Sequence, residues 1–316
     1  MAYVVRRLLL YIPVVFLVFS IVFWFIRFVP ADAVDILLID ATSGQDVAVQ
    51  EAIREDLGLN EPNGKQYFVT LGKYLRGDLG RSMTDGSPVV DEILRRAPIT
   101  LEVAGFALLF ALLIAIPAGV VSAIWQDTIL DYAARIFAIV ALAVPNFWLA
   151  TLIVVYPANL WGYGAPVPYE GLFDDPLTNL RQILPAAVVS GSISAGILAR
   201  FIRSSLLEVL RQDYIRTARA KGLSERSVIF IHAMKNAMGS TITVGGLIFA
   251  NLITAAIVIE QIFTIPGLGR LVVGAISARD YTTLQAVVVF FAFAVVTLNL
   301  LIDLAVGWLD PRVRNV

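Results

Sequence analysis

Residues 211–237 read RQDYIRTARAKGLSERSVIFIHAMKNA, a basic stretch, here called the insert, in a chain otherwise dominated by apolar runs. Asp213 is a favourable helix N-cap, and the residues after it give two turns of helix. Gly222 suits the left-handed position that follows a helix. Ser224 is placed to cap a second helix that starts at Glu225. The insert is therefore predicted to form two short helices bent at a glycine, between two apolar segments.

The exposed faces of these two helices are predicted to be basic. Ala218 and Ala220 keep the first helix thin, so the backbone of another protein can approach it closely. Two other interpretations stay open, namely a basic segment that contacts anionic lipid and a solvated loop that only fixes topology. The glycine bend and the small residues favour a protein partner, because attraction to lipid requires charge but no particular shape. The basic residues concerned are Arg216, Arg219, Lys221 and Arg226.

The composition indicates a membrane protein. Hydrophobic residues make up 58% of the 316 residues and charged residues only 16%, whereas about a quarter of the residues of a soluble domain are charged. The chain has no cysteine, which excludes disulfides and thiol catalysis. We expect an all-α polytopic membrane protein with residues 1–316 in a single domain.

Spanning helices need about 20 mostly apolar residues, and six segments meet this requirement. The first is too long for a signal peptide and lacks a small-residue cleavage site, so we expect it to be retained. Six spans place both termini on one side, and the Lys and Arg excess at the termini and in residues 203–238 predicts that this side is the cytoplasm. The predicted spans are residues 8–28, 101–124, 135–156, 183–202, 240–263 and 283–308.

Residues 29–98 are then an external loop. A helical pattern at residues 47–57 is followed by several residues typical of turns, and together they predict a small cap of short helices on the outer surface. The turn residues are Gly58, Asn60, Pro62, Asn63 and Gly64.

Charged groups within membrane spans are candidates for function. Glu260 lies at the outer end of the fifth span, beside Pro266 and Gly267, where an external gate or a solute ammonium group could meet it. Asn146 and Phe147, which follow the predicted kink at Pro145, are candidates for the translocation path, with anchoring at the membrane interface as the alternative. Ion pairing or snorkelling at a span end is the competing interpretation for all the intramembrane charges, which are Glu102, Arg135, Glu260 and Asp303.

The insert resembles the cytoplasmic coupling loop, or EAA loop, of ABC importer permeases. Ala218 and Gly222 match its general pattern, the Glu of that pattern is absent, and residues 213–225 and 232–237 are similar to the variant found in the dipeptide/oligopeptide/nickel branch. Further strings look like the B-type subunit of that branch in their order and spacing. They lie at residues 56–62, 66–67, 77–82, 96–101, 260–269 and 309–312.

The resemblance implies the type I ABC importer permease fold in the plasma (inner) membrane of a prokaryote. It implies as partners a homologous C-type permease, two cytoplasmic ATPase subunits, an external substrate-binding protein and membrane lipid, with no nucleic acid. The ATPase-coupling residues that it implies are Asp213, Arg216, Ala218, Arg219, Lys221, Gly222, Ser224 and Glu225. The candidates for the path or external gate are Asn146, Phe147, Glu260, Pro266 and Gly267.

No catalytic, cofactor or metal site is predicted in this chain. It lacks the Gly-x-x-x-x-Gly-Lys-Ser/Thr phosphate loop, so ATP and Mg are expected on partner subunits. His232 is the single histidine, without further ligands at metal-binding spacing.

The predicted function is a permease subunit of an ATP-driven importer of peptides or similar small solutes. The alternative is a stand-alone channel or ion-coupled transporter that uses Glu260 and Asp303, against which no inverted repeat is visible. The solute is left open among a dipeptide, an oligopeptide, a nickel chelate, glutathione and an oligosaccharide.

Overall fold

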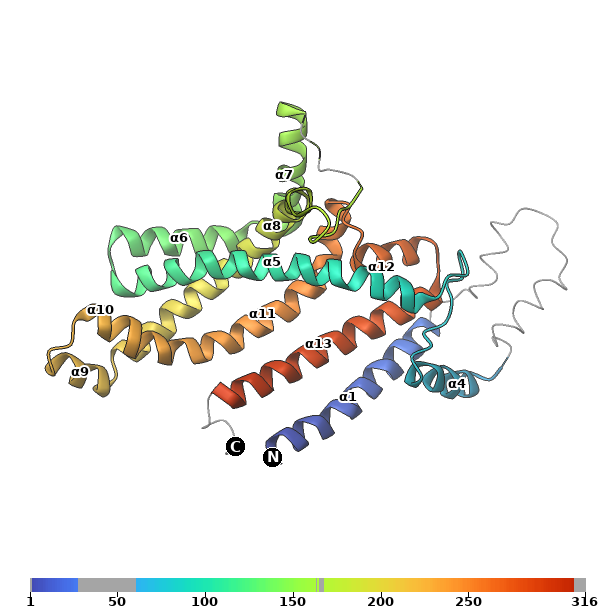
Figure 1. The fold of residues 1–316 in the computed structure, drawn as a ribbon, viewed down its shortest axis with the longest axis horizontal. Coiled ribbons are helices and arrows are strands. Elements are labelled where there is room, and N and C mark those ends of the chain that lie inside the picture. The colour runs from blue at the N-terminus through green and yellow to red at the C-terminus, as the bar shows by residue number, and fades with distance from the viewer. Residues whose placement is uncertain (1, 28–60, 163, 165–167, 310–316) are drawn as a thin grey trace.

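The structure is a computed structural model that describes residues 2–27, 61–162, 164 and 168–309. This part of the chain is built of helices (Figure 1). The all-α polytopic class predicted from the sequence is confirmed. In chain order the helices are α1 (Ala2–Arg27), α4 (Asn63–Leu75), α5 (Val89–Ile124), α6 (Ile129–Ala143), α7 (Asn146–Trp161), α8 (Pro176–Leu210), α9 (Asp213–Ala220), α10 (Glu225–Ser227), η1 (Val228–Ala233), α11 (Met234–Ile262), α12 (Leu268–Ser277) and α13 (Tyr281–Leu309).

Five helices in the described ranges are long and apolar enough to cross a membrane, and α6 with α7 makes a sixth span if the two are counted together. The prediction of one kinked helix at residues 135–156 is wrong, because α6 and α7 meet at an angle of 91°. Val144 has φ −85° and ψ 119°, an extended conformation. Pro145 imposes it, since a proline ring disfavours helical geometry in the residue before it. The proline therefore ends α6 instead of bending a continuous helix.

Helices α5 and α8 run parallel and pack closely along their length. A Cβ atom added to Gly191 would lie 2.5 Å from the carbonyl oxygen of Ala107, and one added to Gly119 would lie 2.8 Å from that of Ala199. Small residues allow this approach, which is the usual way in which membrane helices gain packing energy. Helix α6 joins the same unit, because Gly196 of α8 lies directly against its backbone.

The first and last described helices, α1 and α13, are antiparallel neighbours. The hydroxyl groups of Tyr11 and Thr297 are 2.8 Å apart, and Phe23 packs with Val289 farther along both helices. The start of α1 and the end of α13 therefore lie at one end of the bundle, the end from which the insert projects (Figure 1). This is the arrangement expected for an even number of spans. That this end faces the cytoplasm remains a prediction.

Several helices extend beyond the predicted spans. Helix α5 begins at Val89 and α8 at Pro176, before the predicted spans begin. The prediction missed these turns because hydropathy marks only the part of a helix that lies in lipid. Asn63 and Gly64, predicted to lie in a turn, instead open α4, and Pro62 is the N-cap. The helical pattern predicted at residues 47–57 lies outside the described residues. Helix α12, after the fifth span, was not predicted.

Candidate functional site

The first half of the insert is a short helix, α9, closed by a glycine. Gly222 has φ +80°, so the predicted left-handed conformation is confirmed. Ser224 caps α10 by accepting a hydrogen bond from the amide of Ser227 at 3.4 Å, as predicted. The N-cap of α9 is Gln212 and not Asp213, which is the first helical residue. Asp213 instead pairs with Arg216 and places its charge at the helix N-terminus, where the helix dipole favours it.

The second half of the insert was predicted to be a separate short helix, and this prediction is wrong. From Glu225 the chain continues through α10 and the π-helical turn η1 into α11, so that residues 225–262 form one rod. No proline and no glycine in a left-handed conformation interrupts it, and a helix without such a break continues. π-helical turns are rare and often mark functional positions. This one lies where the insert joins the fifth span.

One face of α9 is fixed to the core of the bundle. Ile215 is fully buried and Ala218 is only 8% exposed, and both pack in the main core with Val228. Asn236 of α11 donates a hydrogen bond to the Tyr214 hydroxyl at 2.9 Å. Ala218 therefore faces its own chain, and the prediction that it is offered to another protein is wrong. It is three residues after Ile215, which places it on the same apolar face.

The opposite face of the insert is exposed and charged. Arg219 pairs with Glu225 across the bend at Gly222, with contacts of 2.8 and 3.3 Å. The other predicted basic groups are exposed beside this pair. The structure thus gathers the predicted coupling residues around a single bend, and all of them except Ala218 are exposed: Asp213, Arg216, Arg219, Lys221, Gly222, Ser224 and Glu225.

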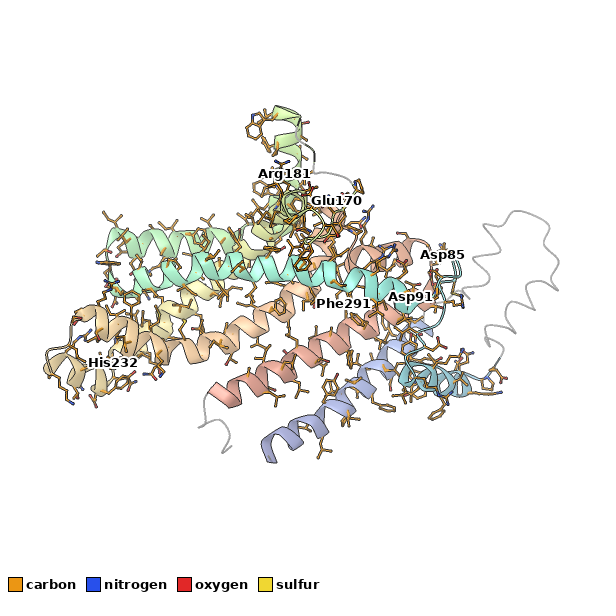
Figure 2. The ribbon with its side chains drawn as sticks, in the orientation of Figure 1. Asp85, Asp91, Glu170, Arg181, His232 and Phe291 are labelled. Atoms are coloured by element: carbon orange, nitrogen blue, oxygen red, sulfur yellow. The ribbon has the colours of Figure 1, made fainter. Side chains whose placement is uncertain are left out.

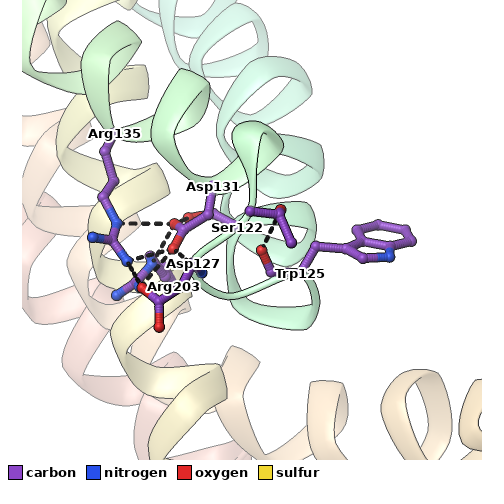
Figure 3. Close-up of polar contacts among 7 residues, drawn as sticks. Ser122, Trp125, Asp127, Asp131, Arg135 and Arg203 are labelled. Atoms are coloured by element: carbon purple, nitrogen blue, oxygen red, sulfur yellow. Dashed lines mark hydrogen bonds and ion pairs between the residues drawn. The ribbon is translucent and has the colours of Figure 1, made fainter.

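A buried carboxylate near the insert was missed by the sequence analysis (Figure 3). Asp131 of α6 is fully buried and accepts two hydrogen bonds from Arg203 of α8, at 3.0 and 3.1 Å. It also accepts from Arg135 at 3.0 Å and from Ser122 of α5. The network connects the last turns of α5 and α8 with the first turn of α6, close to the point where α8 leads into the insert. The four-residue spacing of Asp131 and Arg135 was a signal in the sequence, but the approach of Arg203 was not.

Glu260 does not face a path in this structure. Its carboxylate is fully buried and accepts hydrogen bonds from the Thr100 hydroxyl at 2.6 Å and from the amides of Gly269 and Arg270 at 2.7 and 3.2 Å. It thereby caps the N-terminus of α12, where free amides and the helix dipole favour a negative charge. The structure gives no support to the prediction that Glu260 meets a solute. Gly267, the N-cap residue, is in contact with this carboxylate.

The remaining path candidates lie on a different element. Asn146 and Phe147 begin α7, which stands away from the bundle (Figure 1). Phe147 is 58% exposed, and the next residue, Trp148, is 51% exposed. The described residues therefore leave apolar side chains at the start of α7 uncovered. Of the five candidates, Glu260, Pro266 and Gly267 come together, whereas Asn146 and Phe147 belong to α7.

An open cleft of about 1170 Å³ lies between residues 95–109 of α5, residues 168–174 and the turn before α12, on the side of the bundle away from the insert. Tyr169 donates a hydrogen bond to Glu102 at 2.6 Å. Burial, and then the neighbouring Glu102, raise the pKa of Tyr169 above its usual range, so the phenol keeps its proton and remains a donor. Glu102 is thus held by a hydrogen bond from Tyr169, and the sequence did not indicate this pairing. The charged side chains that line the cleft are Arg95, Arg96, Glu102, Asp174 and Arg270.

Comparison with known proteins places the chain in a transport family. The family described as "binding-protein-dependent transport system inner membrane component" matches residues 115–315. A putative peptide transport system permease protein of Brucella abortus is 39% identical over 313 residues, covering 99% of both chains. The oligopeptide transport system permease protein AppB of Bacillus subtilis is 39% identical over 319 residues, again with 99% of both covered. The dipeptide transport system permease protein DppB of Escherichia coli K12 is 34% identical over 340 residues, covering 99% of this chain and 98% of DppB.

Solved structures show the same fold at low sequence identity. The inward-facing MetNI methionine ABC transporter matches with a TM-score of 0.56 and 17% identity, covering 72% of this chain and all of that one. An amino acid ABC transporter matches with a TM-score of 0.53 and 14% identity, covering 75% and 96%. The type I permease fold is thereby confirmed, and the apolar spans agree with a multi-pass protein of the plasma membrane. The chain belongs to the family of inner membrane components of binding-protein-dependent transport systems.

Proposed function

We propose that this chain is a permease subunit of an ATP-driven importer of peptides or similar small solutes. Its full-length relatives are named as permeases of peptide, dipeptide and oligopeptide transport systems. We assign residues 1–316 to one permease domain, with an external loop at residues 29–98 and a coupling loop at residues 203–238. The observation that carries the proposal is the insert, which is charged and exposed on one face and fixed to the core on the other.

This geometry suits the transmission of force from a soluble partner. Ile215 and Ala218 anchor α9 in the core, and Arg219 pairs with Glu225 across the bend. Helix α9 follows α8 after only Arg211 and Gln212, and the second half of the insert is continuous with α11. A displacement of the insert would therefore pass directly into two spanning helices. A flexible loop that merely fixed the topology would need none of these contacts.

The motor and the delivery system are assigned to other chains. This sequence has no phosphate-binding loop for ATP, so we place ATP and Mg on two cytoplasmic ATPase subunits and give this chain a non-catalytic role. A homologous C-type permease is proposed to cover α7 and complete the path, and an external binding protein to deliver the solute. The comparisons favour this function over a stand-alone channel or an ion-coupled transporter. Consistent with this, Glu260 is engaged in capping α12.

The test is transport by the complete assembly in proteoliposomes, with trialanine as the probe. Uptake is expected to require ATP on the side of the insert and the binding protein on the opposite side. It should also persist when a protonophore abolishes the proton gradient. Uptake that continues without the ATPase subunits, or that stops with the protonophore while ATP is present, would contradict the proposal. Replacing trialanine with a nickel chelate, glutathione or an oligosaccharide then defines the solute class.

A further inference from the structure

The cleft beside residues 95–109 of α5 is lined by a carboxylate with an unused acceptor. Glu102 accepts from Tyr169 through Oε2, while its Oε1 is buried without a hydrogen-bond partner among the described residues. Buried polar atoms are nearly always paired, so an unpaired carboxylate oxygen calls for an explanation. A group that donates several hydrogen bonds and carries a positive charge would satisfy it best, because charge-assisted hydrogen bonds are the strongest.

The wall that carries Tyr169 is held in place by α8. Gln182 donates to the carbonyl of Pro168 at 2.7 Å and accepts from the amide of Glu170 at 3.1 Å. Asn179, which is fully buried, donates to the carbonyl of Glu170 at 3.0 Å and lies 3.3 Å from the Tyr169 hydroxyl. Figure 2 shows Glu170 in the region where α8 begins, in agreement with its contacts to Asn179 and Gln182. Two buried amides thus position the phenol that orients Glu102, which is the kind of support a binding site requires.

The same cleft also carries positive charge. Arg96 uses its Nε to contact Glu92 at 2.8 Å, and Arg270 donates from one Nη to the carbonyl of Thr264 at 2.8 Å. Each guanidinium has five N–H donors, so both have donors left for a carboxylate. A ligand that fits this lining has an ammonium group at one end and a carboxylate at the other. A peptide with free termini has both.

We propose that this cleft is a binding subsite for a peptide with free termini, in which Glu102 accepts the α-ammonium group and Arg96 and Arg270 face the carboxylate. This inference rests on the proposed import of peptides and adds a place where the permease itself contacts its solute. The subsite recognises only the termini, which every peptide shares. It therefore tolerates different side chains, as a general peptide carrier must.

The experiment uses single cysteines, because the chain has none of its own. In the assembled transporter, Leu109→Cys places a thiol in the cleft, and Leu113→Cys places one on the same helix outside it. The rate of labelling by N-ethylmaleimide is measured against increasing trialanine or N-acetyl-trialanine, without the binding protein. We expect trialanine to protect Leu109→Cys and N-acetyl-trialanine to require about tenfold or more higher concentration, since a charged hydrogen bond is lost. Leu113→Cys should be labelled at an unchanged rate.

Variants of the site provide the second readout. Glu102→Gln should weaken protection by trialanine about tenfold and leave protection by N-acetyl-trialanine unchanged, while Glu102→Asp should restore the preference for the free amine. Tyr169→Phe, which removes the orienting phenol, should give a smaller loss in the same direction. Equal protection by both peptides, protection of Leu113→Cys, or no effect of Glu102→Gln would overturn the subsite.

Failure of the subsite is distinguishable from failure of the proposed function. A parent transporter that does not import trialanine refutes peptide import. A transporter that imports trialanine, but in which neither peptide protects Leu109→Cys, refutes only the subsite. Recovery of each variant in the assembled complex at the parent level shows that a changed protection is not due to misfolding.

Discussion

Gly222 and Gly267 are both needed as glycines, but for different physical reasons. Gly222 has φ +80° and open space around the position of a Cβ atom, so only the backbone conformation restricts it. Gly267 has an ordinary φ of −88°, but a Cβ atom there would overlap the Glu260 carboxylate. A side chain at Gly222 would therefore strain the bend of the insert, whereas one at Gly267 would displace the cap of α12.

Gly222→Val is expected to uncouple the transporter without preventing membrane insertion. A β-branched residue in the left-handed region costs about 1–2 kcal/mol, enough to shift the bend that positions the charged face. The number of solute molecules imported per ATP hydrolysed should fall severalfold in proteoliposomes. Gly239→Val is the control, because Gly239 is also exposed and uncrowded but lies within α11. An unchanged ratio of uptake to hydrolysis in Gly222→Val would count against the coupling role.

Glu260→Ala is expected to destabilise the protein, because it leaves two buried donors and one partly buried donor without an acceptor. Each unpaired buried group costs about 1–3 kcal/mol, so the melting temperature of the purified complex should drop by several degrees. Glu61→Ala, which removes only the exposed pair with Lys65, should leave it unchanged. If Glu260→Ala kept full thermal stability and lost only solute uptake, Glu260 would be a gate residue and not a cap.

Among the helices, α5, α6 and α8 behave as one unit at the end that carries the insert. Asp131 is bonded to groups from all three, and Gly119 and Gly196 bring the backbones into contact. Helix α11, in contrast, joins the insert through the π-helical turn η1. A movement of the insert would therefore carry the three-helix unit as a block, while η1 is the irregular point in the rod that leads to α11.

Asp131→Asn is expected to loosen this unit. Removing one member of a buried ion pair costs about 3–5 kcal/mol, because the remaining charges lose their partner, and here Arg135 and Arg203 both depend on Asp131. The midpoint of thermal unfolding should fall, and uptake should fall with it. Asp127→Asn is the matched control, since Asp127 is 66% exposed and contacts Arg135 at 3.3 Å. Equal stabilities of the two variants would show that the network does not join the helices.

For the whole molecule, the structure fixes which segments share an end of the bundle, and the charge distribution predicts which side of the membrane each end faces. His232 marks the end with the insert, and Asp85 lies at the other end (Figure 2). Helix α7 is attached through the 91° bend and presents apolar side chains that the described part of the chain does not cover. A partner in the membrane is the natural cover, consistent with the proposed pairing of two permeases.

The orientation can be tested with single cysteines labelled by a membrane-impermeant maleimide. Thr84→Cys, in the exposed turn before α5, should be labelled in intact cells. Lys221→Cys, in the insert, should be labelled only after the inner membrane is permeabilised, because Lys- and Arg-rich segments stay in the cytoplasm. The reverse pattern would place the insert outside and refute coupling to a cytoplasmic motor.

The sequence by itself determined the features that depend on local chemistry. Apolar runs gave the number and order of the spans, because lipid requires apolar side chains over a fixed length. The left-handed conformation of Gly222 and the cap formed by Ser224 could also be predicted, because each depends on the residue type at a helix end. The exposure of the basic face followed from the cost of burying charge.

Only the tertiary structure decided which distant groups meet. Glu260 was read as a gate because the sequence could not show that α12 folds back and offers its amides. Ala218 was read as a contact surface because nothing local revealed that Ile215 anchors that face in the core. Asp131 gained its importance from Arg203, which lies in a different helix. Such contacts depend on how helices pack, and hydropathy and capping patterns carry little information about packing partners, because they describe one helix at a time.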